Sequence, residues 1–120
     1  MNKEKIEIKV YYNLSQELEN LWLNFEKENN LYLFQKYKFV KNFIDGNEKS
    51  NIFITLSIKN KTLGILPFEI KKKFSFKIIQ WLGTKEFDYC GPLIANLEQE
   101  GIDDTQFKEV WEKIFTKMEN

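Results

Sequence analysis

Residues 52–82 read "IFITLSIKNKTLGILPFEIKKKFSFKIIQWL", and the order of apolar and polar side chains in this stretch predicts a series of β-strands. Over its first part the side chains alternate, with Ile52, Ile54, Leu56 and Ile58 on one face and Thr55 and Ser57 on the other. A period of two predicts a half-buried β-strand. The sequence "KNKT" at 59–62 has the length of a hairpin turn, so we expect residues 63–70 to return as an antiparallel strand.

A run of lysines at 71–73 marks the next reversal of the chain. Lysines at a turn are typical of a solvated surface, and contact with a nucleotide phosphate is the rarer alternative. Residues 74–82 then predict a third antiparallel strand, because both connections are too short for a parallel crossover. Pro67 cannot donate to a strand ladder, so it is expected at a bulge or on the unpaired side of its strand.

The residues before this stretch predict one strand and two helices. Residues 6–12 alternate like a half-buried strand, with Ile6, Ile8 and Val10 on one face. Ser15 can cap a helix that ends at Asn29 and Asn30. Its apolar stripe consists of Leu14, Leu18, Leu21, Trp22 and Phe25. A second helical stripe consists of Phe34, Tyr37, Val40, Phe43 and Ile44, and Asp45-Gly46 predicts its end.

After a loop at 83–101, the spacing of Asp103 and Gln106 fits a capping box at the start of a third helix. The apolar stripe of this helix consists of Phe107, Val110, Trp111, Ile114, Phe115 and Met118. We expect this stripe, Trp111 and Phe115 included, to be buried against the sheet. Residues 1–120 therefore predict a single α+β domain, in which helices pack on a mainly antiparallel sheet.

Charge and composition exclude several classes of protein. The chain has 18 basic and 18 acidic residues, and all the basic ones are lysine, so we expect no nucleic-acid partner. It has no histidine and one cysteine, which argues against a metal site, an internal disulfide and histidine-dependent catalysis. No segment is long and apolar enough for a signal peptide or a membrane span, so a cytoplasmic location is expected.

Three segments together resemble a known family. The stretch "LFQKYKFVKNF" (33–43) resembles a helix near the start of CelD-like acetyltransferases, "LGILPFEI" (63–70) a strand that runs into Leu-Pro, and "WLGTKEFDYCGPLI" (81–94) a segment with Asp-Tyr before Pro-Leu. The three matches follow the family's order. These enzymes have the GNAT acyltransferase fold, are associated with cellulose and polysaccharide biosynthesis, and are distantly similar to FemAB-type enzymes.

The resemblance covers only the N-terminal one of two GNAT-like halves, so it implies a truncated or split chain that is inactive alone. The whole enzyme would transfer an acyl group from acyl-coenzyme A to an amine or hydroxyl of a small, sugar-related acceptor. GNAT enzymes hold the coenzyme A pyrophosphate on backbone amides of a Gln/Arg-x-x-Gly-x-Gly/Ala turn. Gln80 to Gly83 resembles its opening, but Lys85 stands where the second small residue belongs. We expect no cofactor in this segment, and a second half or a partner chain to bind acyl-coenzyme A.

The resemblance also implies candidate site residues. Asp88 would accept a hydrogen bond from the acceptor or act as the catalytic base, and Tyr89 would stack on the substrate. Gln35 and Tyr37 would bind substrate from a facing wall. The alternative is structural, with Asp88 capping loop amides, Tyr89 filling the sheet edge and Tyr37 packing in the core. Cys90, with no histidine to activate it, is expected to be a small buried hydrophobe.

A second class of function fits the same residues. A small α+β domain can act as a stand-alone protein-interaction module, with an exposed sheet edge or loop that binds a partner and no catalytic activity. The sequence does not choose the acceptor, the acyl group or the oligomeric state.

Overall fold

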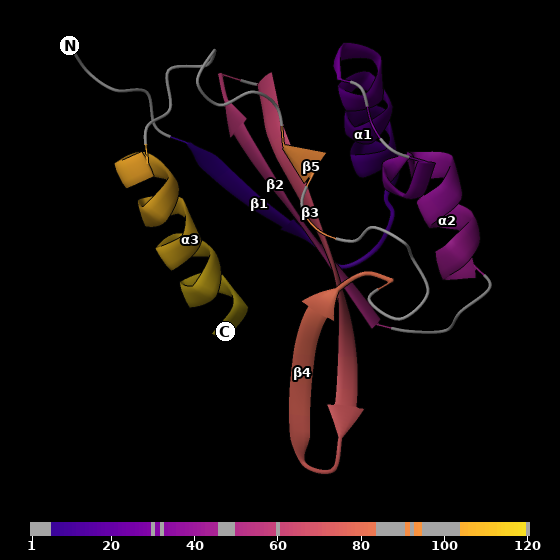
Figure 1. Ribbon diagram of the computed structural model, residues 1–120, viewed down its shortest axis with the longest axis vertical. Helices are drawn as coiled ribbons and strands as arrows, with labels where there is room; N and C mark the ends of the chain where they lie inside the picture. Colours follow the sequence, from indigo (N-terminus) through magenta and orange to yellow (C-terminus); the bar gives the residue numbers. More distant parts are fainter. Residues whose placement is uncertain are drawn as a thin grey trace.

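The computed structural model describes residues 6–29, 31, 33–45, 50–59, 61–83, 91, 93–94 and 104–119 (Figure 1). In chain order its elements are β1 (Glu7–Tyr11), α1 (Gln16–Glu28), a 3-10 turn η1 (Leu33–Gln35), α2 (Tyr37–Asp45), β2 (Ser50–Ile58), β3 (Lys61–Lys73), β4 (Phe76–Trp81), β5 (Leu93–Ile94) and α3 (Asp104–Glu119). The strands form an antiparallel sheet in the order β1-β2-β3-β4, and β5 pairs with β3 beside β4. The α+β prediction is confirmed.

The central strands pair as consecutive antiparallel neighbours, as predicted. Ile54 of β2 lies opposite Leu66 of β3, and Ile70 of β3 lies opposite Ile79 of β4. Ile58 lies opposite Lys61, so the first hairpin closes on a two-residue turn. Short hairpin turns need a positive φ, which Lys59 adopts at 47°.

The second reversal is not where the lysines were expected to place it. β3 continues through all three lysines, and Lys73 lies opposite Phe76. The turn is formed by Phe74 and Ser75, with Phe74 at a φ of 59°. The prediction of a strand over 74–82 is therefore wrong at its start. Lysine is only mildly disfavoured in strands, so a lysine run does not end a strand that its partner keeps paired.

Pro67 lies at a gap in the strand pairing along one edge of β3, which corresponds to the second of the two expected placements. On this edge β3 pairs with β5 through residues 64–65 and with β4 from Phe68 onward, so the proline lies between two partners. Its carbonyl accepts a hydrogen bond from the Leu82 N–H at 3.1 Å. Because N and C=O of a residue in an antiparallel strand point to the same edge, the missing N–H also faces this gap. The register shift of the β2–β3 pair lies elsewhere.

Helices cover both faces of the sheet, α3 on one side and α1 with α2 on the other (Figure 1). The α3-side core contains Ile6, Ile52, Ile54, Leu56, Leu63, Leu66, Phe68, Val110 and Ile114. The α1–α2-side core contains Tyr11, Leu18, Trp22, Phe25, Tyr37, Val40, Phe53, Ile65, Leu82 and Leu93. β2 is consequently buried on both faces. Thr55, expected to face solvent, is buried, because a second helical layer covers its side of the sheet.

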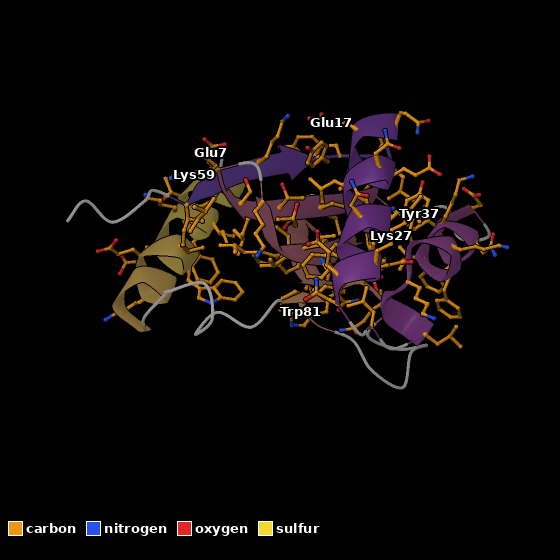
Figure 2. The ribbon with its side chains drawn as sticks, turned by 90° about the horizontal axis from the view of Figure 1, so that it is seen from above. Glu7, Glu17, Lys27, Tyr37, Lys59 and Trp81 are labelled. Carbon is orange, nitrogen blue, oxygen red and sulfur yellow. The ribbon has the colours of Figure 1, made fainter. Side chains whose placement is uncertain are left out.

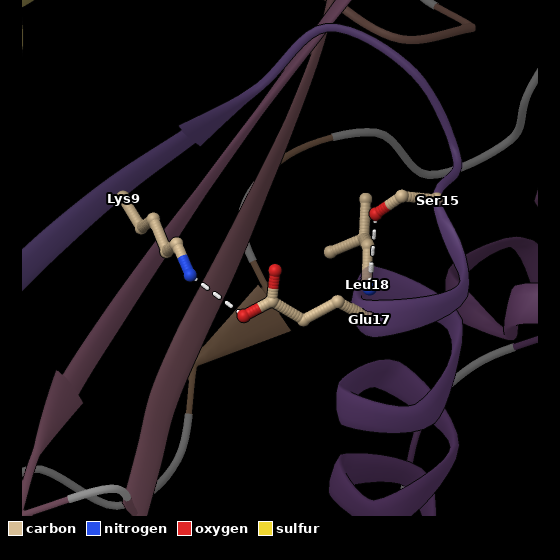
Figure 3. Close-up of polar contacts among 4 residues, drawn as sticks. All are labelled: Lys9, Ser15, Glu17 and Leu18. Carbon is tan, nitrogen blue, oxygen red and sulfur yellow. Dashed lines mark hydrogen bonds and ion pairs between the residues drawn. The ribbon is translucent and has the colours of Figure 1, made fainter.

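Ser15 begins α1 as predicted (Figure 3). Its Oγ accepts a hydrogen bond from the Leu18 N–H at 3.3 Å, which satisfies one of the free amides at the helix start. The first turn is also joined to the sheet, because Lys9 Nζ of β1 donates to Glu17 Oε1 at 2.6 Å. Both side chains of this ion pair are largely exposed, so it orients the helix while contributing little to stability.

The second helix begins later than the sequence suggested. Residues 33–35 form a 3-10 turn, so Phe34 precedes the α-helix, which begins at Tyr37. The carboxylate of Glu26, on α1, accepts a hydrogen bond from the Tyr37 N–H. This bond satisfies a free amide at the start of α2 from a neighbouring helix, which no local pattern reveals.

α3 packs on the sheet through part of the expected stripe. Val110 and Ile114 are buried, and Trp111 is half-buried against the same core. Phe115 is 59% exposed and stacks on Trp111, so the expectation that it is buried is wrong. An apolar stripe assigned from helical spacing is wider than the part of the helix surface that the sheet covers. None of the described helices is long and apolar enough to cross a membrane.

The two neighbours Ile114 and Phe115 provide a matched test of this packing. We expect Ile114→Ala to lower the free energy of unfolding by about 2–5 kcal/mol, because it removes a fully buried side chain from a closed core. Phe115→Ala should cost less than ~1 kcal/mol. Urea unfolding followed by circular dichroism measures both, and equal losses would show that α3 packs with a different face.

Candidate functional site

Three polar side chains lie side by side across the sheet. Asn51 of β2 lies opposite Glu69 of β3, which in turn lies opposite Gln80 of β4. Cross-strand neighbours share a face, and the period of two places this polar row on the same face as Phe53 and Leu82. The row therefore borders the α1–α2-side core, where an apolar residue would be the ordinary choice.

Glu69 is the central member of the polar row and is only 1% exposed. Its Oε1 accepts a hydrogen bond from the Gly83 N–H at 2.8 Å. A buried carboxylate is tolerated only where such bonds replace water. Gly83 follows β4 at a φ of 77°, a conformation that glycine adopts without steric cost. The carboxylate thereby fixes the point at which the chain leaves the sheet.

The amides beside Glu69 add donors and acceptors to the same place. Asn51 Oδ1 and Gln80 Nε2 are both buried. Gln80 Nε2 finds no hydrogen-bond acceptor among the residues that the structure describes. Buried polar groups normally have partners, so the unused donor of Gln80 calls for an explanation, and a bound polar group would supply one.

A pocket of about 600 Å³ opens next to the polar row. Its walls come from the connection between β1 and α1, the end of α2 and the start of β2. Asn51 belongs both to the polar row and to the pocket wall. The other polar side chains of the wall are Asn13, Lys41, Asp45 and Ser50, and the apolar part includes Tyr12, Leu14, Ile44, Phe53 and Ile70.

The two charged side chains of the pocket wall, Lys41 and Asp45, are accessible to solvent. Lys41 Nζ and Asp45 Oδ2 are 3.7 Å apart, one helical turn from each other, and both side chains are more than half exposed. Such a pair is weak in water, so a ligand can displace it. Tyr12 is 68% exposed and offers an aromatic face at the rim. An aromatic face with amides, a hydroxyl, an ammonium and a carboxylate suits a small ligand that carries several hydroxyl or amino groups.

The structure places Gln35 and Tyr37 in the interior. Gln35 is buried, and its carbonyl accepts a hydrogen bond from Trp22 Nε1 at 2.9 Å. Tyr37, which Figure 2 labels beside α1, is buried on the α1–α2 side of the sheet. Its ring meets that of Trp22 edge-on at 5.8 Å. Neither residue lines the pocket. Asp88 and Tyr89, like Cys90, lie outside the described residues.

Burial governs the chemistry of Tyr37. Loss of solvent raises the pKa of its phenol, and the nearby charges of Glu19 and Asp45 raise this pKa further. A tyrosine in this setting stays protonated and packs like a phenylalanine. The geometry thus corresponds to the structural alternative for Tyr37.

Sequence reasoning missed the polar row and the pocket. A signal was present, since Glu69 is a charge within the apolar run "LGILPFEI". It was not decisive because both faces of β3 are buried, and the alternation alone does not tell which face a charge occupies. Among the described residues no group of three or more His, Cys, Asp or Glu side chains could hold a metal ion.

Comparison with family models, with curated proteins and with solved structures finds no match for this chain.

The hydrogen bond to Gly83 gives the polar row a measurable role. Glu69→Leu fills most of the same volume but leaves the Gly83 N–H without its acceptor, so we expect a loss of about 1–3 kcal/mol in the free energy of unfolding. Glu69→Gln keeps an oxygen in place and should retain most of that stability. Chemical denaturation compares the two. If they lose the same amount, the bond does not hold the chain there.

The burial of Tyr37 predicts an alkaline pH dependence. Its folded pKa lies above that of free tyrosine, about 10, so the unfolded chain releases this proton first as pH rises. The stability that the protonated Tyr37 phenol contributes is fully present below pH ~10, and it is lost as pH rises toward the folded pKa. We expect Tyr37→Phe to remove this part of the alkaline loss in stability, measured by thermal melting across that range. An alkaline loss in stability that is unchanged in Tyr37→Phe would contradict this assignment.

Proposed function

We propose that this chain is the N-terminal, substrate-side half of a CelD-like GNAT acyltransferase, and that the pocket beside the polar row binds the acceptor. The reaction would move an acyl group from the sulfur of acyl-coenzyme A to an amine or hydroxyl of the acceptor, with the acceptor proton ending on the coenzyme A thiol. The observation that carries the proposal is the continuity of the pocket with the buried carboxylate through Asn51.

The lining of the pocket supports a sugar-related acceptor. A sugar has an apolar ring face and a rim of hydroxyl groups, and the pocket offers Tyr12 for the first and Asn13, Ser50 and Asn51 for the second. Asp45 would bind an amino group, since a carboxylate pairs with an ammonium. Polysaccharide biosynthesis, to which the resembled family is linked, uses acceptors of this chemistry.

The surroundings of Gly83 support the view that acyl-coenzyme A binds elsewhere. Its amide would open the pyrophosphate cradle, but that N–H is already bonded to Glu69 Oε1. A carboxylate at this distance would repel a pyrophosphate. No arginine is available as a substitute, because every basic residue of the chain is lysine. In this proposal a second GNAT-like half or a partner chain supplies the cofactor site, and this half alone is inactive.

Asp88 and Tyr89 keep their proposed roles at the acceptor. They follow Gly83 closely in the sequence, and Glu69 anchors Gly83 at the end of the polar row. Asp88 would serve as base or hydrogen-bond acceptor, and Tyr89 would contact the substrate. Gln35 and Tyr37 would support the site from the interior, by holding Trp22 and α2 in place.

One observation favours the alternative, a protein-interaction module without catalytic activity. Phe76, Ile78 and Ile79 of β4 are all exposed, and within the described residues no strand pairs with the outer edge of β4. An apolar edge strand is a common surface for a partner.

Titration with small sugars tests the acceptor proposal. Glucosamine is added to the chain, and its binding is followed by NMR of the backbone amides. We expect millimolar glucosamine to shift the amide signals of residues 12–14, 41–45 and 50–53. Asp45→Asn should weaken glucosamine binding several-fold while leaving that of glucose nearly unchanged, because only the amine loses a charge partner. Shifts spread evenly over the surface, or none at all, would favour the interaction module.

Acetyl-coenzyme A provides a second test. The isolated 120-residue chain should give no measurable heat on calorimetric titration with this cofactor, because Glu69 occupies the amide that a phosphate needs. Micromolar or tighter binding would contradict the assignment of the cofactor site to a second half.

A further inference from the structure

The hairpin between β3 and β4 extends beyond the rest of the sheet. The last pair between β2 and β3 joins Ser50 to Ile70, so residues 71–73 and 76–78 continue as two strands alone. The hairpin projects along the longest dimension of the molecule, away from the described helices (Figure 1). Its turn therefore forms one end of the molecule, where an external surface can contact the hairpin without contacting the body of the sheet.

The apolar side chains of the hairpin become more exposed toward its tip. Ile79 and Ile78 are 38% and 42% exposed, Phe76 is 71% exposed, and Phe74, at the turn itself, is 94% exposed. Large aromatic side chains at this level of exposure are uncommon on a free surface. Phe74 also holds a positive φ, which is unfavourable for a bulky residue and favourable for glycine.

The same segment carries a local excess of positive charge. Lys71, Lys72, Lys73 and Lys77 flank the two phenylalanines, and no acidic residue occurs between Glu69 and Glu86. The chain as a whole has no net charge. These four lysines therefore give the tip of the hairpin a positive charge, and a molecule that binds the tip is expected to be anionic.

We propose that the tip of the β3–β4 hairpin binds an anionic lipid bilayer. Phe74 and Phe76 enter the boundary between headgroups and acyl chains, and the flanking lysines contact lipid phosphates and carboxylates. Lysine suits this position, since its long stem can lie along apolar surface while its ammonium stays at headgroup level.

The shape of the hairpin favours a bilayer over a protein strand. A flat surface that meets the hairpin end-on covers Phe74 first, which matches the order of exposure along the hairpin. A strand added along β4 would instead cover Ile78 and Ile79 and leave Phe74 in water. Insertion is shallow, because the outer edge of β4 carries backbone groups that need water or another polar partner.

Sedimentation with lipid vesicles tests the proposal. We expect the full chain to sediment with phosphatidylcholine vesicles that contain roughly one-quarter phosphatidylserine, and to stay in solution with phosphatidylcholine alone. The double substitution Lys72→Gln and Lys73→Gln should weaken partitioning on the order of 25-fold, about five-fold for each charge. Phe74→Ser should weaken it about ten-fold.

Two further variants separate binding from folding. Phe74→Gly removes the aromatic ring but suits a positive φ, so it should melt at or above the temperature of the parent and still lose lipid binding. The matched control combines Leu33→Ser, Lys36→Gln and Lys38→Gln, since these exposed residues belong to the segment of η1 and the start of α2, which lies apart from the hairpin tip (Figure 1). The control should bind vesicles like the parent.

Three results would overturn the proposal. One is a parent chain that binds both kinds of vesicle equally, or that binds neither of them. Another is full binding by Phe74→Gly. The third is a hairpin-dependent dimer in sedimentation equilibrium without vesicle binding, which would assign the surface to a second copy of the chain.

Discussion

Both layers of the fold are organised by β3, which pairs with neighbouring strands along both of its edges. β3 pairs with β2 along one edge, while β5 and β4 share the other edge on either side of Pro67. The proline makes this division possible, since it has no N–H to offer a third partner there. The side chains of β3 also reach both cores, because Ile65 packs under α1 and α2 while Leu66 packs under α3. A change in the register of β3 would therefore disrupt both layers at once.

The polar row is the exception within this packing, and the candidate site is built on it. A carboxylate in the interior reduces the stability of an isolated sheet unless its hydrogen bonds are complete. Glu69 accepts a hydrogen bond from the Gly83 amide, so the same group that lowers core hydrophobicity also fixes the position of Gly83 just after β4. Through Asn51 the row reaches the pocket. The proposed acceptor site therefore depends on strand register, which links any loss of sheet pairing to a loss of binding.

The sequence predicted those parts of the fold that depend on local pattern. Alternation located the three central strands, and Ser15 located the start of α1. It did not show that Thr55 is buried, because coverage of the second face depends on helices distant in sequence. For the same reason Tyr37 was open to two interpretations until its contact with Trp22 placed it in the core. The candidate site was the least predictable part, since the pattern placed the three strands side by side but did not give the register that brings Asn51, Glu69 and Gln80 into one row.

The outer part of the β3–β4 hairpin receives little support from the other described residues. Two strands without a third neighbour or a covering layer are marginal in water, and this extension begins where β2 ends. Its register is imposed from the body, where Phe68 stacks on Trp81 at 4.6 Å. Toward Phe74 burial falls and the backbone adopts a conformation that disfavours an aromatic residue. Local opening should begin at this tip, and a surface that binds the closed hairpin would stabilise it by mass action.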